Sequence, residues 1–291
     1  MMDQPAIAPR TRTIALPSRG GEIAALEFGP GDRPVDVVFS HANGFNAATY
    51  RSILAPLSSE LRILAYDLRG QGRTRLPAEA GAHPGWTVFR DDLLAVLEAE
   101  TSGPVVLAGH SMGATASLLA AASQPDRVRE LLLFEPVIFP GIHQAQPGAG
   151  GGSMLSDGAL RRRRWFASRQ EALQSYRGRG AFRTWSEEQL ADYVEAGFVD
   201  QPDGGVGLAC APEWEAASYR MHRYDPVAAF AATGCPVLVL RGEHHSTVQI
   251  TGDDLPTTGR IELRTVPGAS HFLPMEHPQL LRRELRRAAG D

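Results

Sequence analysis

Residues 105–122 predict a strand, a one-residue corner and a helix in immediate succession. The run 105–108 is aliphatic and β-branched, Gly-His-Ser-Met-Gly follows at 109–113, and small residues continue to 122. In a Gly-x-Ser-x-Gly corner the serine hydroxyl stands above the end of the sheet, beside the free N–H groups of the next helix. The pattern therefore predicts a nucleophile at Ser111. The alternative is an ordinary serine N-cap of a helix.

The length and charge of the chain narrow the classes of protein that it can form. Its 291 residues are many for one core and few for two independent domains, so we expect one core that carries an insertion. The formal net charge of -4 indicates neither binding to nucleic acid nor binding to an anionic membrane. Residues 1–12 lack the apolar segment of a secretory signal, and no apolar run is long enough to span a membrane. We expect a soluble cytoplasmic protein, either a monomer or a homodimer.

Strand and helix patterns alternate over most of the chain. Residues 11–16 and 22–28 predict a hairpin, and further strands are predicted at 35–40, 62–67, 105–108, 130–134, 236–242 and 260–266. Predicted helices cover 47–57, 86–98 and 278–289. This alternation is typical of an α/β fold with a mostly parallel, doubly wound sheet. Because ligands of such sheets bind at the carboxyl ends of the strands, Asn43, Ser111 and Glu135 are candidate site residues.

The alternation stops between residues 137 and 225. Helical patterns cover 159–174 and 186–196, and the glycine-rich run 148–153 is typical of a flexible loop. We therefore predict a core of residues 1–136 and 226–291 with a mostly helical cap of residues 137–225. Four arginines at 161–164 point in different directions on a helix and have glutamates nearby, which favours a solvated surface over a nucleic-acid interface.

Four motifs in a fixed order make the chain resemble the α/β-hydrolase superfamily. They are His-Ala-Asn-Gly-Phe at 41–45, Asp-Leu-Arg-Gly-Gln-Gly at 67–72, Gly-His-Ser-Met-Gly at 109–113 and Gly-Ala-Ser-His-Phe at 268–272. The resemblance covers nearly the whole chain and implies an α/β-hydrolase fold, with the insertion in the place of the family's variable cap.

The resemblance also implies roles for single residues. Ser111 matches the nucleophile and His271 the general base that takes and returns its proton. The backbone N–H groups of Met112 and Asn43 match the two arms of the oxyanion hole. For His41 and His110 we expect structural hydrogen bonds, and for Asp67 and Arg69 a role in bracing the loop below the site.

The acid that should orient His271 departs from the commonest pattern of the family. Members usually carry an aspartate shortly after the strand that corresponds to 236–241, but here His245 stands at that position. A histidine cannot serve as a permanent anion. Some branches, among them haloalkane dehalogenases and certain lactone hydrolases, take the acid from the end of the preceding strand, where this chain has Glu135.

Glu135 is accordingly our candidate for the acid. Glu243 is the first alternative, and Asp253 and Asp254 are remoter ones. The structural alternative for Glu135 is a salt bridge to an arginine of the cap.

The candidate residues predict acyl transfer without a cofactor. A serine nucleophile excludes the dehalogenase and epoxide-hydrolase mechanisms, which need an aspartate at the corner, and leaves hydrolysis of a carboxylic ester or lactone through an acyl-enzyme. The adjacent residues His244 and His245 are not spaced to bind one metal ion, and the two cysteines match no zinc motif or disulfide framework.

The aromatic composition of the cap predicts a small, apolar ester or lactone as the substrate, in contact with Phe45, Phe139 and Trp165. Other activities of the same scaffold stay open at this point: a C–C bond hydrolase, a thioesterase, a perhydrolase or a lyase. So does a small-molecule receptor with slow turnover.

Overall fold

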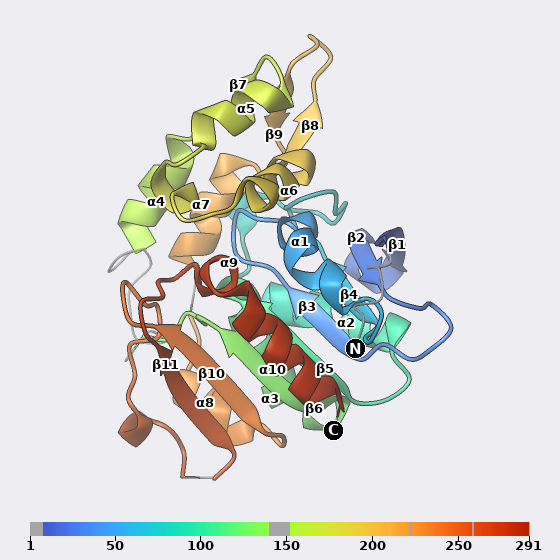
Figure 1. The fold of residues 1–291 in the computed structure, drawn as a ribbon, viewed down its shortest axis with the longest axis vertical. Helices are drawn as coiled ribbons and strands as arrows, with labels where there is room; N and C mark the ends of the chain where they lie inside the picture. Colours follow the sequence, from blue (N-terminus) through green and yellow to red (C-terminus); the bar gives the residue numbers. More distant parts are fainter. Residues whose placement is uncertain (1–7, 140–151, 222, 258, 291) are drawn as a thin grey trace.

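An eight-stranded sheet forms the centre of the molecule in the computed structural model, which describes residues 8–139, 152–221, 223–257 and 259–290 (Figure 1). The strand order is β1-β2-β4-β3-β5-β6-β10-β11. The strands are β1 (Arg10–Leu16), β2 (Gly21–Phe28), β3 (Val37–Ser40), β4 (Ile63–Tyr66), β5 (Val105–His110), β6 (Val128–Phe134), β10 (Val237–Gly242) and β11 (Ile261–Val266). Only β1 and β2 pair antiparallel to their neighbours within this sheet, so the predicted hairpin and the mostly parallel α/β-hydrolase fold are confirmed.

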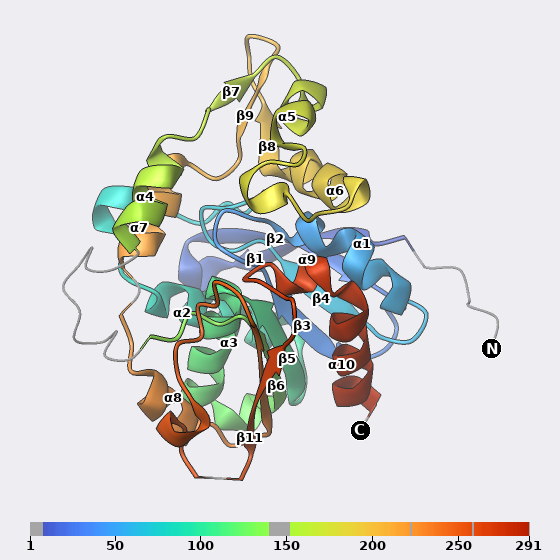
Figure 2. The ribbon, with the colours of Figure 1, turned by 60° about the vertical axis from the view of Figure 1, so that its left-hand side comes forward.

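Helices cover both faces of the sheet (Figures 1 and 2). One face carries α2 (Thr87–Glu100), α3 (Met112–Ser123) and α8 (Pro226–Ala232), and the other carries α1 (Arg51–Leu54) and α10 (Pro278–Gly290). The continuous apolar run of β5 follows from this arrangement, because Val105 and Leu107 belong to one core cluster while Val106 and Ala108 belong to the other.

A second group of elements lies above the carboxyl ends of the central strands (Figures 1 and 2). It consists of α4 (Gly152–Leu160), β7 (Trp165–Phe166), α5 (Arg169–Tyr176), α6 (Glu187–Gly197), β8 (Phe198–Asp200), β9 (Val206–Leu208) and α7 (Pro212–Arg220). We call this group, residues 152–220, the cap elements. The predicted boundary at 136/137 falls just after β6, and that at 225/226 falls at the start of α8.

Two expectations for this region need correction. The helix predicted over 159–174 is interrupted: α4 ends at Leu160, β7 pairs with β9, and α5 begins after Ser168, whose side chain caps it by accepting from the Glu171 N–H. The cap elements also include a three-stranded sheet of order β7-β9-β8. Of the glycine-rich run, residues 148–151 lie outside the described residues, and Gly152 begins α4.

Three of the four consecutive arginines pair with glutamates of the same cap elements. Arg163 contacts Glu171 at 2.7 Å, Arg164 contacts Glu213, and Arg162 contacts the buried Glu215 at 2.6 Å. Glutamates thus balance these positive charges locally.

Candidate active site

Ser111 occupies the corner between β5 and α3 with an unusual backbone conformation. Its φ of 55° lies where L-residues are strained, and its N–H donates to the Phe134 carbonyl at 3.0 Å. The flanking glycines are required by close approach: a Cβ on Gly113 would lie 2.3 Å from the Ser40 carbonyl oxygen, and one on Gly109 would lie 2.7 Å from the Ala114 nitrogen. The sequence pattern thus holds the hydroxyl at the carboxyl end of the sheet.

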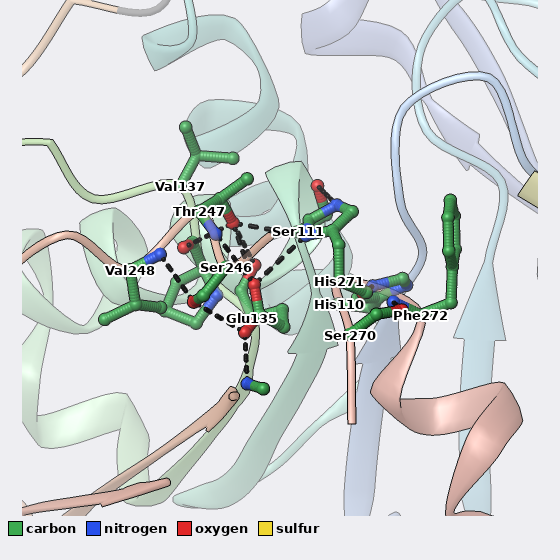
Figure 3. Close-up of polar contacts among 12 residues, drawn as sticks. His110, Ser111, Glu135, Val137, Ser246, Thr247, Val248, Ser270, His271 and Phe272 are labelled. Carbon is green, nitrogen blue, oxygen red and sulfur yellow. Dashed lines mark hydrogen bonds and ion pairs between the residues drawn. The ribbon is translucent and has the colours of Figure 1, made fainter. Parts of the chain in front are cut away.

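His271 links Ser111 to Glu135 (Figure 3). Its Nε2 lies 3.1 Å from the Ser111 Oγ, and its Nδ1 lies 3.1 Å from the Glu135 Oε2. The three side chains come from separate parts of the chain, namely the corner after β5, the end of β6 and the turn after β11. The structure therefore brings together the serine, the histidine and the acid that the sequence nominated.

Glu135 is fully buried at the end of β6 and is held by donors from the last residue of β10 and from the loop after β10 (Figure 3). Ser246 Oγ donates to its Oε1 at 2.7 Å, the Gly242 N–H donates to the same oxygen, and the Thr247 N–H donates to Oε2 at 2.9 Å. Burial alone would raise the pKa of Glu135, but the contacts with His271 and these donors outweigh it and leave the pKa below its ordinary value. The acid is thus kept ionised beside the histidine.

The alternative acids lie elsewhere. Glu243 is half-exposed and accepts from the Gly268 N–H at 2.9 Å. Asp254 accepts from the Thr251 N–H at 2.7 Å, and both it and Asp253 are exposed. Glu135 contacts His271 Nδ1 through its Oε2, and among the described residues it forms no ion pair with an arginine of the cap elements.

The loop after β3 approaches the start of α3, where a Cβ on Gly113 would lie 2.4 Å from the His41 carbonyl oxygen, and it is braced from below. Neither the Asn43 N–H nor the Met112 N–H donates to an acceptor within the part of the chain that the structure describes. Asp67 accepts from the Ala47 N–H at 2.7 Å and the Arg73 N–H at 2.7 Å, and Arg69 forms a buried ion pair with Asp92 at 2.6 Å. The two N–H groups remain available to a ligand oxygen.

Two buried histidines stabilise these loops and are neutral. His41 contacts the Ala42 carbonyl through Nδ1 at 2.7 Å and accepts from the Leu68 N–H at 2.9 Å, and burial lowers its pKa to about 4. His110 contacts the His271 carbonyl through Nε2 at 2.7 Å, and burial holds its pKa well below the usual range. Since that carbonyl is an acceptor, the proton of His110 is on Nε2.

Tyr50 connects His110 to the loop after β3, a role that no motif of the chain predicts. Its buried hydroxyl donates to the His110 Nδ1 at 2.7 Å and accepts from the Ala42 N–H at 3.3 Å. A chain of hydrogen bonds therefore joins the neighbour of Asn43 to the backbone of His271.

Of the predicted substrate contacts, Phe45 packs against residues next to the three side chains, including Phe272 beside His271 and His110 beside Ser111. Its ring packs 6.5 Å from Phe272, 5.3 Å from Trp185 and 6.2 Å from His110, measured between centroids. These rings form an apolar wall between the loop after β3 and the turn that carries His271. Trp185 and Phe272 were not nominated from the sequence.

The other two predicted substrate contacts, Phe139 and Trp165, lie in different parts of the molecule. Phe139 follows β6 and packs, partly buried, against the core cluster on the α3 side. The prediction for Trp165 needs correction: it lies in β7, at the end of the cap elements away from the corner (Figures 1 and 2). Its ring covers Gly205 and its indole N–H donates to Asp203 at 3.2 Å, so the small outer sheet accounts for this tryptophan.

No group of three or more histidine, cysteine, aspartate or glutamate side chains gathers as metal ligands within the described ranges. Over the same residues, no helix is long and apolar enough to cross a membrane.

The parallel sheet and the contact of Ser111, His271 and Glu135 are those of a hydrolase. Residues 37–284 match the model of the alpha/beta hydrolase family, so the chain belongs to that family. It is similar to the 2-(acetamidomethylene)succinate hydrolase of Mesorhizobium japonicum, with 27% identity over 252 residues and 84% of each chain covered. It is also similar to the 2-hydroxy-6-oxo-2,4-heptadienoate hydrolase of Pseudomonas putida, with 35% identity over 105 residues, 36% of this chain and 37% of that protein.

Solved structures show the same fold. The crystal structure of E-2-(acetamidomethylene)succinate hydrolase superposes with a TM-score of 0.79 at 23% identity and covers 97% of this chain and 100% of that one. The thioesterase domain from the curacin biosynthetic pathway superposes with a TM-score of 0.74 at 20% identity, over 96% and 99% of the two chains.

Proposed function

We propose that this protein hydrolyses a carboxylic ester or lactone through an acyl-enzyme intermediate on Ser111. The observation that carries the proposal is the unbroken contact from the Ser111 Oγ through both nitrogens of His271 to Glu135. A serine hydroxyl beside a histidine, whose other nitrogen faces a buried carboxylate, is the arrangement that activates a serine nucleophile.

Acylation follows from this geometry. The Ser111 Oγ forms a bond to the substrate carbonyl carbon while His271 Nε2 takes the serine proton. Glu135 stabilises the resulting imidazolium, and the N–H groups of Asn43 and Met112 donate to the oxyanion of the tetrahedral intermediate. When the intermediate collapses, the bond to the leaving oxygen breaks and the alcohol leaves with the proton from His271.

Deacylation repeats these steps with water as the nucleophile. His271 takes a proton from water as its oxygen bonds to the acyl carbon, and then returns the proton to the Ser111 Oγ when the carboxylic acid is released. The ring wall of Phe45, Trp185 and Phe272 supports an apolar substrate, because aromatic faces beside the reacting atoms favour apolar groups.

A second candidate function is hydrolysis of a substrate in which the acyl carbon is bonded to nitrogen or carbon instead of oxygen. The similarity to 2-(acetamidomethylene)succinate hydrolase favours it, because that similarity extends over 84% of both chains. The same serine, histidine and oxyanion hole would act, and only the leaving group would differ.

Hydrolysis of p-nitrophenyl esters of increasing acyl length, measured beside the Ser111→Ala variant, tests the proposal. We expect turnover in the unmodified protein, an optimum at a short to medium acyl chain, and loss of turnover in the variant. Turnover that persists in Ser111→Ala would contradict the proposal. If esters fail while enamide or β-diketone substrates are cleaved in a Ser111-dependent way, the second candidate is correct.

A further inference from the structure

The loop that carries Asn43 is also held from above, by the cap elements. The Asn43 side-chain Nδ2 donates to the backbone carbonyl of Glu215 in α7 at 3.1 Å. Gly44 has a φ of 75°, and a Cβ on it would lie 2.5 Å from the Glu215 Oε1. The loop after β3 and the Glu215 side chain are therefore in direct contact, and only a glycine fits at position 44.

Arg162 fixes that glutamate and reaches a second contact to the same loop. Its Nη1 donates to the Glu215 Oε2 at 2.6 Å, and its Nη2 donates to the Tyr193 hydroxyl at 2.6 Å. The Tyr193 hydroxyl in turn lies 3.5 Å from the Gly44 carbonyl oxygen. The Glu215 side chain is only 9% exposed, so the pair lies in a poorly solvated environment where loss of either partner is costly.

The core contributes the remaining restraint. Gln71 accepts from the Gly44 N–H at 2.6 Å and donates to the Asn43 Oδ1 at 3.3 Å. Gln71 of the core thus contacts both Asn43 and Gly44. The cap elements contact the same two residues through Glu215 and Tyr193. The position of the Asn43 N–H depends on contacts from both sides.

We propose that Arg162 and Glu215 are positioning residues of the oxyanion hole, which set the Asn43 N–H through the Asn43 side chain and Gly44. The inference rests on the proposed serine mechanism. The Asn43 N–H meets an oxyanion only after the carbonyl has been attacked, so its position affects the stability of the transition state. The ion pair of the cap elements would therefore affect kcat more than substrate binding. Arg162 and Glu215 touch no reacting atom in this role.

The chain offers a matched control for this ion pair. Arg164 and Glu213 come from the same two segments, two residues away in each, and form an ion pair with both side chains about half-exposed. Arg162→Met and Glu215→Gln should lower kcat by about 10- to 100-fold and leave KM within about threefold. Arg164→Met and Glu213→Gln should leave both constants unchanged.

A variant with a smaller perturbation guards against loss of folding. Tyr193→Phe removes only the hydroxyl that lies between Arg162 and the Gly44 carbonyl, and we expect kcat to fall by about three- to tenfold. Arg162→Lys keeps the charge but not the two-pronged contact, and it should recover part of the kcat that Arg162→Met loses.

Binding of phenylboronic acid separates the inference from the proposed function. The Ser111 Oγ forms a bond to boron, its proton goes to His271, and one boronate oxygen occupies the oxyanion hole without any turnover. We expect calorimetry to show weaker boronate binding in Arg162→Met, Glu215→Gln and Tyr193→Phe, in proportion to their loss of kcat. Boronate affinity and kcat equal to those of the unmodified protein in all three folded variants would overturn the inference. No boronate binding in the unmodified protein would instead overturn the serine mechanism, and the inference with it.

Discussion

The hydroxyl of Ser246 donates to the Glu135 Oε1 at 2.7 Å, from the loop in which the family usually carries the acid itself. In this protein the end of β6 supplies the carboxylate, and the loop after β10 supplies hydrogen-bond donors to it. Glu135 has a φ of 51°, which turns its side chain under His271 at the end of the strand. The loop after β10 therefore still contacts the triad, but it holds the acid instead of carrying it.

Removal of this donor should cost stability in a pH-dependent way. Because the pKa of Glu135 is depressed in the folded protein, its contribution to stability is present above its ordinary value near 4.5 and is lost as the pH falls through the folded value. Ser246→Ala should lower the free energy of unfolding by about 2 kcal/mol at pH 7, and this loss should become smaller as the pH falls through the folded pKa of Glu135. Urea unfolding over a series of pH values from neutral into acid checks this, and a loss that is the same at every pH would contradict the assigned contact.

Glu135→Gln should abolish most of the activity while the protein stays folded. A neutral amide cannot stabilise the imidazolium or select the correct tautomer of His271, so we expect kcat to fall by about 10³- to 10⁴-fold. Glu243→Gln is the matched control, since Glu243 is half-exposed and contacts the Gly268 N–H. If Glu243→Gln loses the activity and Glu135→Gln keeps it, the assignment of the acid is wrong.

His41 should make the protein less stable in mild acid. Burial lowers its pKa to about 4, so below about 6.5 the unfolded chain binds a proton that the folded protein does not. The free energy of unfolding should therefore decrease by roughly 3 kcal/mol on this account between pH 6.5 and 4. His41→Asn should remove that part of the slope in denaturant titrations, whereas His244→Asn, whose side chain is 60% exposed in the parent, should keep it.

Alanine should have opposite effects at two helical glycines. On Gly113 a Cβ would meet the carbonyl oxygens of Ser40 and His41 at 2.3 and 2.4 Å, so Gly113→Ala should lower stability by on the order of 3 kcal/mol. Gly158 in α4 has open space around its Cβ position, so Gly158→Ala should raise stability by about 0.5 to 1 kcal/mol. Thermal unfolding of both variants tests whether close approach of α3 to β3 explains the glycine after Met112.

The fold was predictable because its signals are local. The buried strands are continuous apolar runs between turns, and the corner at Ser111 carries a pattern with a steric cause in Gly109 and Gly113. Glu135 could be nominated because some branches that the chain resembles carry the acid at that place, and because a carboxylate at the end of an apolar strand has little structural reason to be there. The donors Ser246 and Thr247 could not, since small polar residues after a strand are also what an ordinary loop contains.

The errors lie in the cap elements, where no repeating unit constrains the chain. The helix predicted over 159–174 is interrupted in its middle, because aromatic residues suit a short strand as well as a helix and Trp165 and Phe166 pair as β7 with β9. Trp165 was assigned to the substrate from composition alone, whereas Trp185, which packs against Phe45 and Phe272, was not. Which of the two tryptophans packs beside the site depends on contacts between distant segments of the chain. Such contacts cannot be inferred from one sequence.

The acyl-enzyme mechanism is tested most directly by a pre-steady-state measurement with a p-nitrophenyl ester, followed by mass spectrometry of the quenched protein. We expect a burst of p-nitrophenol close to one equivalent and an acyl group on the Ser111 peptide, both absent in Ser111→Ala. Steady turnover with no acyl adduct, or an adduct on another residue, would contradict the role of Ser111 as the nucleophile.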